Sequence, residues 1–236
     1  MSSSERTISK KQSKGMPEPR HVPAERPGRS GGKRDANRRA KTDALCLAGL
    51  ALFLERGIEA VTIDELARSA GVAKGSFYRY FKDKSDLVDA LLEPLSREVL
   101  TAFENCDQAL RRASDANLTG AYLALAQDLT RILAERRDFV RLYLQENRGP
   151  GVGARAPIAR LSARITESAF RLTQVAHNAG LLFSVHPRVT ALSVVGATER
   201  LLHAHLSGED VGDNEASIAM ALITMVLEGM RPRAPR

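Results

Sequence analysis

The sequence contains no tryptophan and little of several other residue types. Its two cysteines, Cys46 and Cys106, lie far apart and form no Cys-x-x-Cys pair. The sequence therefore predicts neither a disulfide framework nor a cysteine zinc site. The longest apolar run, 44–54, has eleven residues. A membrane-spanning helix needs about 20, so we expect no transmembrane segment.

The overall composition fits a globular protein. Hydrophobic residues make up 43% and charged residues 27% of the 236 residues, which is enough apolar material for a folded core. That length allows one large domain or two smaller ones.

The positive charge is concentrated near the N-terminus. Residues 1–41 contain twelve Lys and Arg and four acids, a net charge of +8, and residues 42–236 sum to −1. Residues 1–36 are rich in Ser, Gly and Pro and poor in large apolar residues, so we expect a disordered basic tail. Such a segment beside a nearly neutral body favours a polyanionic partner, nucleic acid before membrane. A solvated tail that only aids solubility is the alternative.

Arg38 and Arg39 stand at the end of this basic segment, ahead of the apolar run. Paired arginines before an apolar run also occur in export signals. Here, however, polar residues 40–43 intervene, and no small-residue cleavage site follows the run. We therefore expect a cytoplasmic protein and count both arginines among the candidate nucleic-acid contacts.

From Asn37 onward, apolar residues recur at helical spacing, and no segment alternates long enough to form a strand. The sequence predicts an all-α protein of about nine helices, with a kink in the fourth at Pro94. The expected helices are 37–56, 62–70, 73–81, 85–105, 117–135, 138–147, 157–179, 187–206 and 214–230.

The most informative pattern lies in residues 62–84. Thr62 and Glu65 have the spacing of a capping box, in which each side chain accepts a hydrogen bond from the other residue's backbone N–H. A short helix, a turn at Gly71 and a second short helix make a helix-turn-helix. In DNA-binding proteins the second helix of this motif enters the major groove.

The second helix, 73–81, has two different sides. At about 100° per residue, Phe77 and Phe81 share the side toward the small core. The rest of the helix carries side chains that suit bases and phosphates. These candidates are Lys74, Gly75, Ser76, Tyr78, Arg79 and Tyr80. Lys84, at the start of the next helix, is a candidate for phosphate binding. An aromatic cluster is more often core than contact, and the motif also occurs where no DNA is bound, so spacing alone leaves both alternatives open.

Residues 43–92 resemble the N-terminal domain of the tetracycline-repressor (TetR) family in spacing, residue type and order. The segments that carry the resemblance are FLERG at 53–57, VTIDELA at 61–67 and AGVAKGSFYRYFKDKSDL at 70–87. The resemblance implies a DNA-binding domain over 37–84. It also implies a regulatory domain over 85–236 that binds a ligand and dimerises.

The resemblance implies a role for each matching residue. Thr62 corresponds to a cap that contacts phosphate, and Lys84 to a phosphate-binding lysine. Tyr80 stands where many members have histidine, which keeps a hydrogen-bonding tip but alters its reach. The matching recognition-helix contacts are Lys74, Gly75, Ser76 and Tyr78.

The family plan further implies a small-molecule effector within residues 96–183. We expect it to be apolar or aromatic, because ligand cavities are mostly apolar with a few polar groups. The candidate ligand-binding residues are Phe103, Tyr122, Phe139, Tyr143, Phe170, Gln174 and His177. For any single aromatic among them, a place in the core is the alternative.

The sequence predicts a homodimer through helices 187–206 and 214–230. The first is rich in small residues, and the second is apolar around much of its circumference, so it must be covered from more than one side. A two-fold dimer would also place two recognition helices about 34 Å apart, one DNA turn.

We expect a ligand-responsive transcriptional regulator, most simply a repressor that leaves a palindromic operator when its effector binds. No catalytic or metal-ligand pattern occurs, and the G-x-G-x-x-A motif at 151–156 lacks the preceding strand that dinucleotide binding requires. We therefore expect no enzyme, metal or cofactor. The alternative is a DNA-compacting protein or an enzyme that uses the same helical fold.

Overall fold

A computed structural model describes residues 32–112, 118–179 and 186–211, together with 217, 218, 221, 222 and 224. These residues form eight α-helices and one short 3-10 helix, and they contain no strand. The elements are α1 (Lys33–Arg56), α2 (Ile63–Ser69), α3 (Lys74–Phe77), α4 (Lys84–Arg112), α5 (Leu118–Glu135), α6 (Arg137–Glu146), η2 (Gly153–Arg155), α7 (Ala156–Asn178) and α8 (Pro187–Leu206). The predicted all-α class is confirmed.

Three element boundaries differ from the prediction by more than one residue. α1 begins at Lys33, inside the expected tail. Gly32 is its N-cap residue, and Asp35 places a favourable negative charge in the first turn. α4 runs to Arg112, and Pro94 lies within it without ending it. α3 ends at Phe77, because the amides of Arg79 and Tyr80 bond three residues back and tighten the last turn.

The predicted last helix, 214–230, falls mostly outside the described residues. Its five described positions are helical, and Ile218 and Leu222 among them are buried. The basic tail lies outside as well, up to residue 31.

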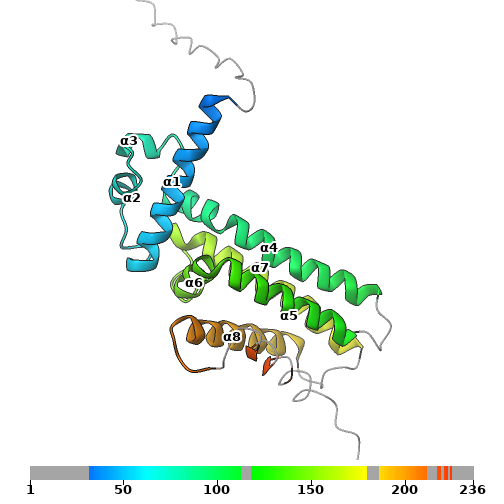
Figure 1. The fold of residues 1–236 in the computed structure, drawn as a ribbon. Coiled ribbons are helices and arrows are strands. Elements are labelled where there is room, and N and C mark those ends of the chain that lie inside the picture. The colour runs from blue at the N-terminus through cyan, green and yellow to red at the C-terminus, as the bar shows by residue number, and fades with distance from the viewer. Residues whose placement is uncertain are drawn as a thin grey trace, which may run out of the picture.

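The molecule has two parts with one continuous core. α1, α2 and α3 gather at one end, and α4–α8 form an elongated bundle beside them (Figure 1). Leu45, Phe53, Leu66 and Phe77 are fully buried in the smaller part, and Leu87 continues this core into α4. Among the described helices none is long and apolar enough to cross a membrane.

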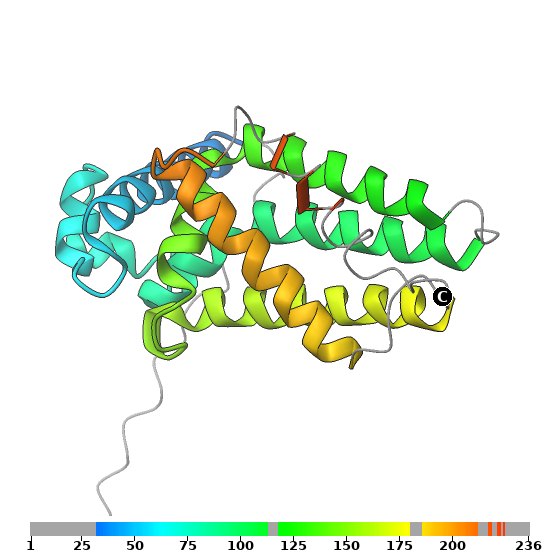
Figure 2. The ribbon, with the colours of Figure 1, turned by 90° about the horizontal axis from the view of Figure 1, so that it is seen from below.

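In the bundle, α4 packs against α5 and α7, and α7 packs against α8. Figure 2 shows α8 running obliquely across the other helices of the bundle. α6 occupies a central position, because it contacts α1 on one side and α4, α5 and α8 on the others.

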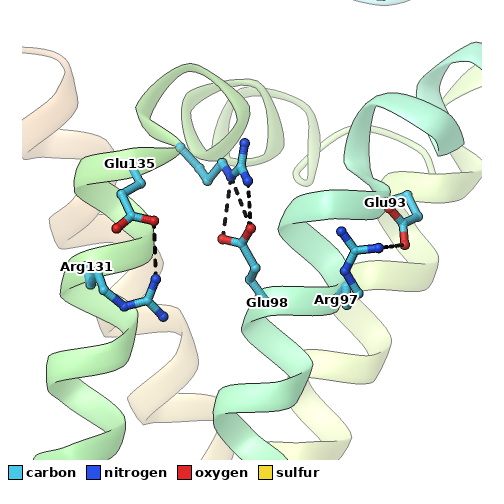
Figure 3. Close-up of polar contacts among 6 residues, drawn as sticks. Glu93, Arg97, Glu98, Arg131 and Glu135 are labelled. Carbon is cyan, nitrogen blue, oxygen red and sulfur yellow. Dashed lines mark hydrogen bonds and ion pairs between the residues drawn. The ribbon is translucent and has the colours of Figure 1, made fainter. Parts of the chain in front are cut away.

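The corner between α5 and α6 is tied to α4 by an ion pair. Arg136, the residue between the two helices, donates from Nη2 to Oε1 of Glu98 at 2.7 Å and from Nε to the same carboxylate. Figure 3 shows Glu98 reaching from α4 toward this corner, while the pairs Glu93–Arg97 and Arg131–Glu135 each stay on one helix. Arg136 holds the pKa of Glu98 below its usual value.

Candidate DNA interface and ligand cavity

The predicted capping box is present at the start of α2. The backbone N–H of Glu65 donates to Thr62 Oγ1 at 3.3 Å, and the N–H of Thr62 donates to Glu65 Oε2 at 2.8 Å. Arg56, in the last turn of α1, donates to Glu65 Oε1 at 2.8 Å. Hydrogen bonds from Arg56 first and Thr62 second lower the pKa of Glu65 to about 2. This carboxylate therefore fixes α2 against α1.

α3 presents several of the predicted contact residues to solvent. Lys74, Gly75, Tyr78 and Arg79 are exposed, and Ser76 is half-buried. Arg79 Nη2 donates to Ser76 Oγ at 2.6 Å. These two predicted base-reading side chains therefore hold each other in place on the outer side of the helix, while Phe77 lies in the core as predicted.

Lys74 joins α3 to α2. Its Nζ lies 2.7 Å from Asp64 Oδ2, and both side chains are exposed. An exposed pair of this kind stabilises a protein by roughly 0–1 kcal/mol, so the lysine can exchange Asp64 for a phosphate at little cost.

Gly75 is not required by the protein's own packing. A Cβ built there would meet nothing within 4 Å, and its φ lies outside the left-handed region. Gly71, in the turn before α3, differs because its φ is +64°, a conformation that favours glycine.

Tyr80 and the two predicted arginines occupy different surroundings. Tyr80 is half-buried and packs against the core, so less of it faces outward than of Tyr78, which is 54% exposed. Arg38 and Arg39 are exposed on the first turns of α1, at the same end of the molecule as α3 (Figure 1).

The structure gives Lys84 a role other than the expected phosphate contact. Its Nζ donates to the backbone carbonyls of Ile58 at 2.7 Å, Val61 at 2.9 Å and Glu59 at 3.2 Å. An ammonium group has three donors, so all of them are used within the protein. Burial lowers the pKa of Lys84. The lysine fastens the start of α4 to the loop that precedes α2.

α6 reaches the same loop from the other side. The carboxylate of Glu146 is buried and accepts from Arg155 Nε at 2.6 Å and from the backbone N–H of Ile58 at 3.2 Å. The neighbouring Gln145 donates to the carbonyl of Phe53 on α1 at 3.1 Å. We call Lys84, Gln145, Glu146 and Arg155 the polar junction. It joins the bundle of α4–α8 to the helix-turn-helix.

A cavity of about 300 Å³ lies within the bundle, at the lower end of the usual range for ligand sites. Its wall is largely aliphatic and comes from α4, α5, α6, α7 and α8, with Ile218 and Leu222 added from beyond α8. Three of the seven predicted ligand-binding residues line it: Phe103, Tyr122 and Tyr143.

The other four predicted ligand residues do not line the cavity. Phe139 and Phe170 are half-buried, and Arg188 lies 5.4 Å from the ring of Phe170. Gln174 is exposed. His177 is half-buried, and its Nδ1 is buried with no hydrogen-bond partner among the described residues. The prediction rested on their aromatic or polar character, and their positions on the helices place them outside the cavity wall.

The sequence prediction did not include Glu199, which forms a polar pair with Tyr143 in the cavity wall. Tyr143 on α6 donates from its hydroxyl to Glu199 Oε1 on α8 at 2.6 Å. Burial first, and then the negative charge of Glu199, raises the pKa of Tyr143. A signal for Glu199 was present, because it lies four residues after Val195 and three before Leu202, on an apolar stripe of its helix.

No group of three or more His, Cys, Asp and Glu residues in the described ranges could hold a metal ion. The two histidines near the end of α8 belong to no such cluster in that part of the chain.

Comparison with known proteins finds similar sequences for part of the chain. Residues 46–91 match the family model for "Bacterial regulatory proteins, tetR family". The transcriptional regulator AcuR of Cereibacter sphaeroides is 37% identical over 130 residues, which are 55% of this chain and 56% of AcuR. The transcriptional repressor KstR2 of Mycolicibacterium smegmatis is 33% identical over 88 residues, 36% of this chain and 41% of KstR2. The chain thus spans about half the length of these relatives or less.

The likeness in fold extends to the bundle of α4–α8. The transcriptional regulator FadR of Bacillus subtilis, solved in complex with stearoyl-CoA, aligns with a TM-score of 0.61 at 15% identity. The alignment covers 80% of this chain and 99% of that one. At this identity the likeness concerns the fold alone. Residues 46–91 are thus similar to the tetR family of bacterial regulatory proteins, and the solved regulator shares the fold of most of the chain.

Proposed function

We propose that this protein is a sequence-specific DNA-binding transcriptional regulator, and most simply a repressor. In this proposal a small apolar or aromatic effector occupies the cavity and releases the protein from a palindromic operator. The observation that carries the proposal is the outer side of α3. It presents Gly75, Tyr78 and Arg79 to solvent, and a Cβ built at Gly75 would meet nothing within 4 Å.

The relatives support both halves of this proposal. AcuR is a transcriptional regulator and KstR2 is a transcriptional repressor by name. The regulator FadR of Bacillus subtilis is described in complex with an acyl-CoA. By analogy, the cavity of this chain is the place for an effector, and the protein works in the cytoplasm, without catalysis, where its operator lies.

α6 offers a direct route from the cavity to the DNA interface. Val140, Tyr143 and Leu144 line the cavity, and the next two residues belong to the polar junction with the loop before α2. An effector can release DNA only if it binds better to a conformation in which the recognition helices are wrongly placed. A shift of α6 or α4 would move that loop through Glu146 or Lys84. A coupling of about 1–3 kcal/mol would change operator affinity roughly 5–150-fold.

The test is to capture and sequence the genomic fragments that the protein retains. A regulator is expected to protect one short palindrome, and Arg79→Ala should weaken that binding by roughly 1–3 kcal/mol while leaving binding to random DNA nearly intact. Coating of DNA with little sequence preference would favour the DNA-compacting alternative. Equal losses on operator and random DNA would contradict base reading by Arg79.

A further inference from the structure

We propose that the cavity selects apolar compounds that carry a basic nitrogen, and that Glu199 binds this nitrogen as an ammonium group. The inference rests on the proposed function, because it names the chemical class of the effector. Three features of the cavity wall carry it.

The first feature is the charge of the wall. Glu199 is the one Asp, Glu, Lys, Arg or His among the described lining residues. Ile218 and Leu222 also contribute, and the sequence from 217 to 227 contains no basic residue. Among its described residues the wall thus has a carboxylate and no cation with which to bind an anionic head group.

The second feature is that most hydroxyl donors of the wall, all but that of Thr190, are already used within the protein. Tyr122 donates to the carbonyl of Leu172 at 2.8 Å. Three threonines donate to the carbonyl four residues earlier in their own helices. They are Thr130, Thr173 and Thr198, at 2.8, 2.8 and 2.7 Å. These groups have no remaining proton to offer a ligand.

The third feature is the spare capacity of Glu199. A carboxylate has two oxygens and about four acceptor sites. Among the described residues, the bond from Tyr143 is the one hydrogen bond that Glu199 accepts. Glu199 is half-buried, and the part of a carboxylate that lies in apolar surroundings is costly unless it is bonded. A charged donor makes the strongest such bond, so an ammonium group satisfies Glu199 better than a hydroxyl does. A ligand carboxylate would be repelled by Glu199 and would find no cation among the described lining residues.

Three compounds that differ only at one end test the proposal: 4-phenylbutylamine, 4-phenylbutanol and 4-phenylbutanoate. Calorimetric titration of the full chain without DNA should rank the amine first and the carboxylate last. Glu199→Gln should weaken amine binding about tenfold or more, as expected for loss of a charge-assisted hydrogen bond. It should leave alcohol binding nearly unchanged. Glu104→Gln, at an exposed acid on α4, is the matched control and should change none of the three affinities.

Tyr143→Phe keeps the carboxylate and removes its protein donor, so the amine should bind at least as tightly as it does to the wild type. The inference is overturned if the carboxylate binds as well as the amine, if Glu199→Gln leaves amine affinity unchanged, or if none of the three binds. A separate DNA titration tests the proposed function. Binding of the amine through Glu199 without any change in operator affinity would keep the present inference and remove the induction mechanism.

Discussion

At the scale of single residues, the clearest signs of function are residue types that the fold itself does not require. Gly75 is an example, because a Cβ at this position meets nothing within 4 Å and the backbone is not in the left-handed region. Its absent side chain leaves space beside Ser76 and Tyr78, on the side of α3 that faces away from Phe77. The space is of use only if another molecule approaches there.

Gly75→Ala should therefore affect stability and DNA binding in opposite directions. Alanine in a helix is favoured over glycine by roughly 0.5–1 kcal/mol, so the free energy of unfolding should rise slightly while operator affinity falls. Urea denaturation and operator titration measure the two effects. Gly71→Ala is the control, because its φ of +64° makes alanine cost roughly 1–2 kcal/mol. Unchanged operator affinity for Gly75→Ala would show that DNA does not approach this glycine.

Lys84 is expected to bind phosphate, but its ammonium group is already bonded within the protein. Lys84→Met removes three hydrogen bonds to the loop before α2, and loss of bonds to a charged donor of this kind costs about 1.5–3 kcal/mol. We expect lower stability and weaker operator binding, with no change in the dependence of that binding on salt. A shallower salt slope with unchanged stability would instead restore the phosphate contact.

At the scale of elements, the capping box of α2 makes stability depend on pH. The pKa of Glu65 is about 2 in the folded protein, against about 4.3 for an unperturbed glutamate. Its stabilising effect is therefore fully present above about pH 4.3 and is lost as the pH falls toward 2.

Glu65→Gln should flatten the decline in stability across this pH range, as measured by urea denaturation at several pH values. Glu104→Gln, which changes an exposed acid outside the box, serves for comparison and should leave the profile of the wild type. A wild-type slope that persists in Glu65→Gln would assign the decline to other carboxylates.

The helices themselves were largely predictable, because caps, glycines and apolar spacing are local signals. Thr62, Gly57 and Gly71 marked their boundaries correctly. The length of α3 was not predictable, since the amides of Arg79 and Tyr80 could close either a tight or a regular turn. The cavity was predicted only in part. Phe103 and Phe139 look alike in sequence, and only the packing of five helices decides that the former lines the cavity.

At the scale of the whole molecule, α8 has two faces with different surroundings. Ala191, Thr190 and Ala204 are buried, whereas Val189 and Leu192 are each 53% exposed. Gly196, four residues after Leu192, is also exposed, and a Cβ there would meet nothing within 4 Å. Exposed apolar residues beside a glycine permit close approach of another helix, so this face is where we place the predicted dimer contact.

Gly196→Arg should give a monomer without lowering the stability of the subunit, because the new side chain points away from the described packing. Analytical ultracentrifugation at micromolar concentration measures the assembly, and operator titration should show a parallel loss. Ser193→Ala, one turn earlier on an exposed position, keeps the surface small and should remain dimeric. A monomeric wild type would contradict the predicted dimer and, with it, the paired arrangement of two recognition helices.

The two faces of α8 have a consequence for how the protein would respond to the concentration of its effector. Glu199 and Leu202 line the cavity, and Gly196 is exposed on the same helix. Whatever occupies the cavity would then alter subunit association, and reciprocity requires that association alter occupancy by the same factor. The apparent affinity for the effector should therefore change when the protein is diluted. The threshold at which a cell responds would thus be set by the number of regulator copies it holds as well as by the compound itself.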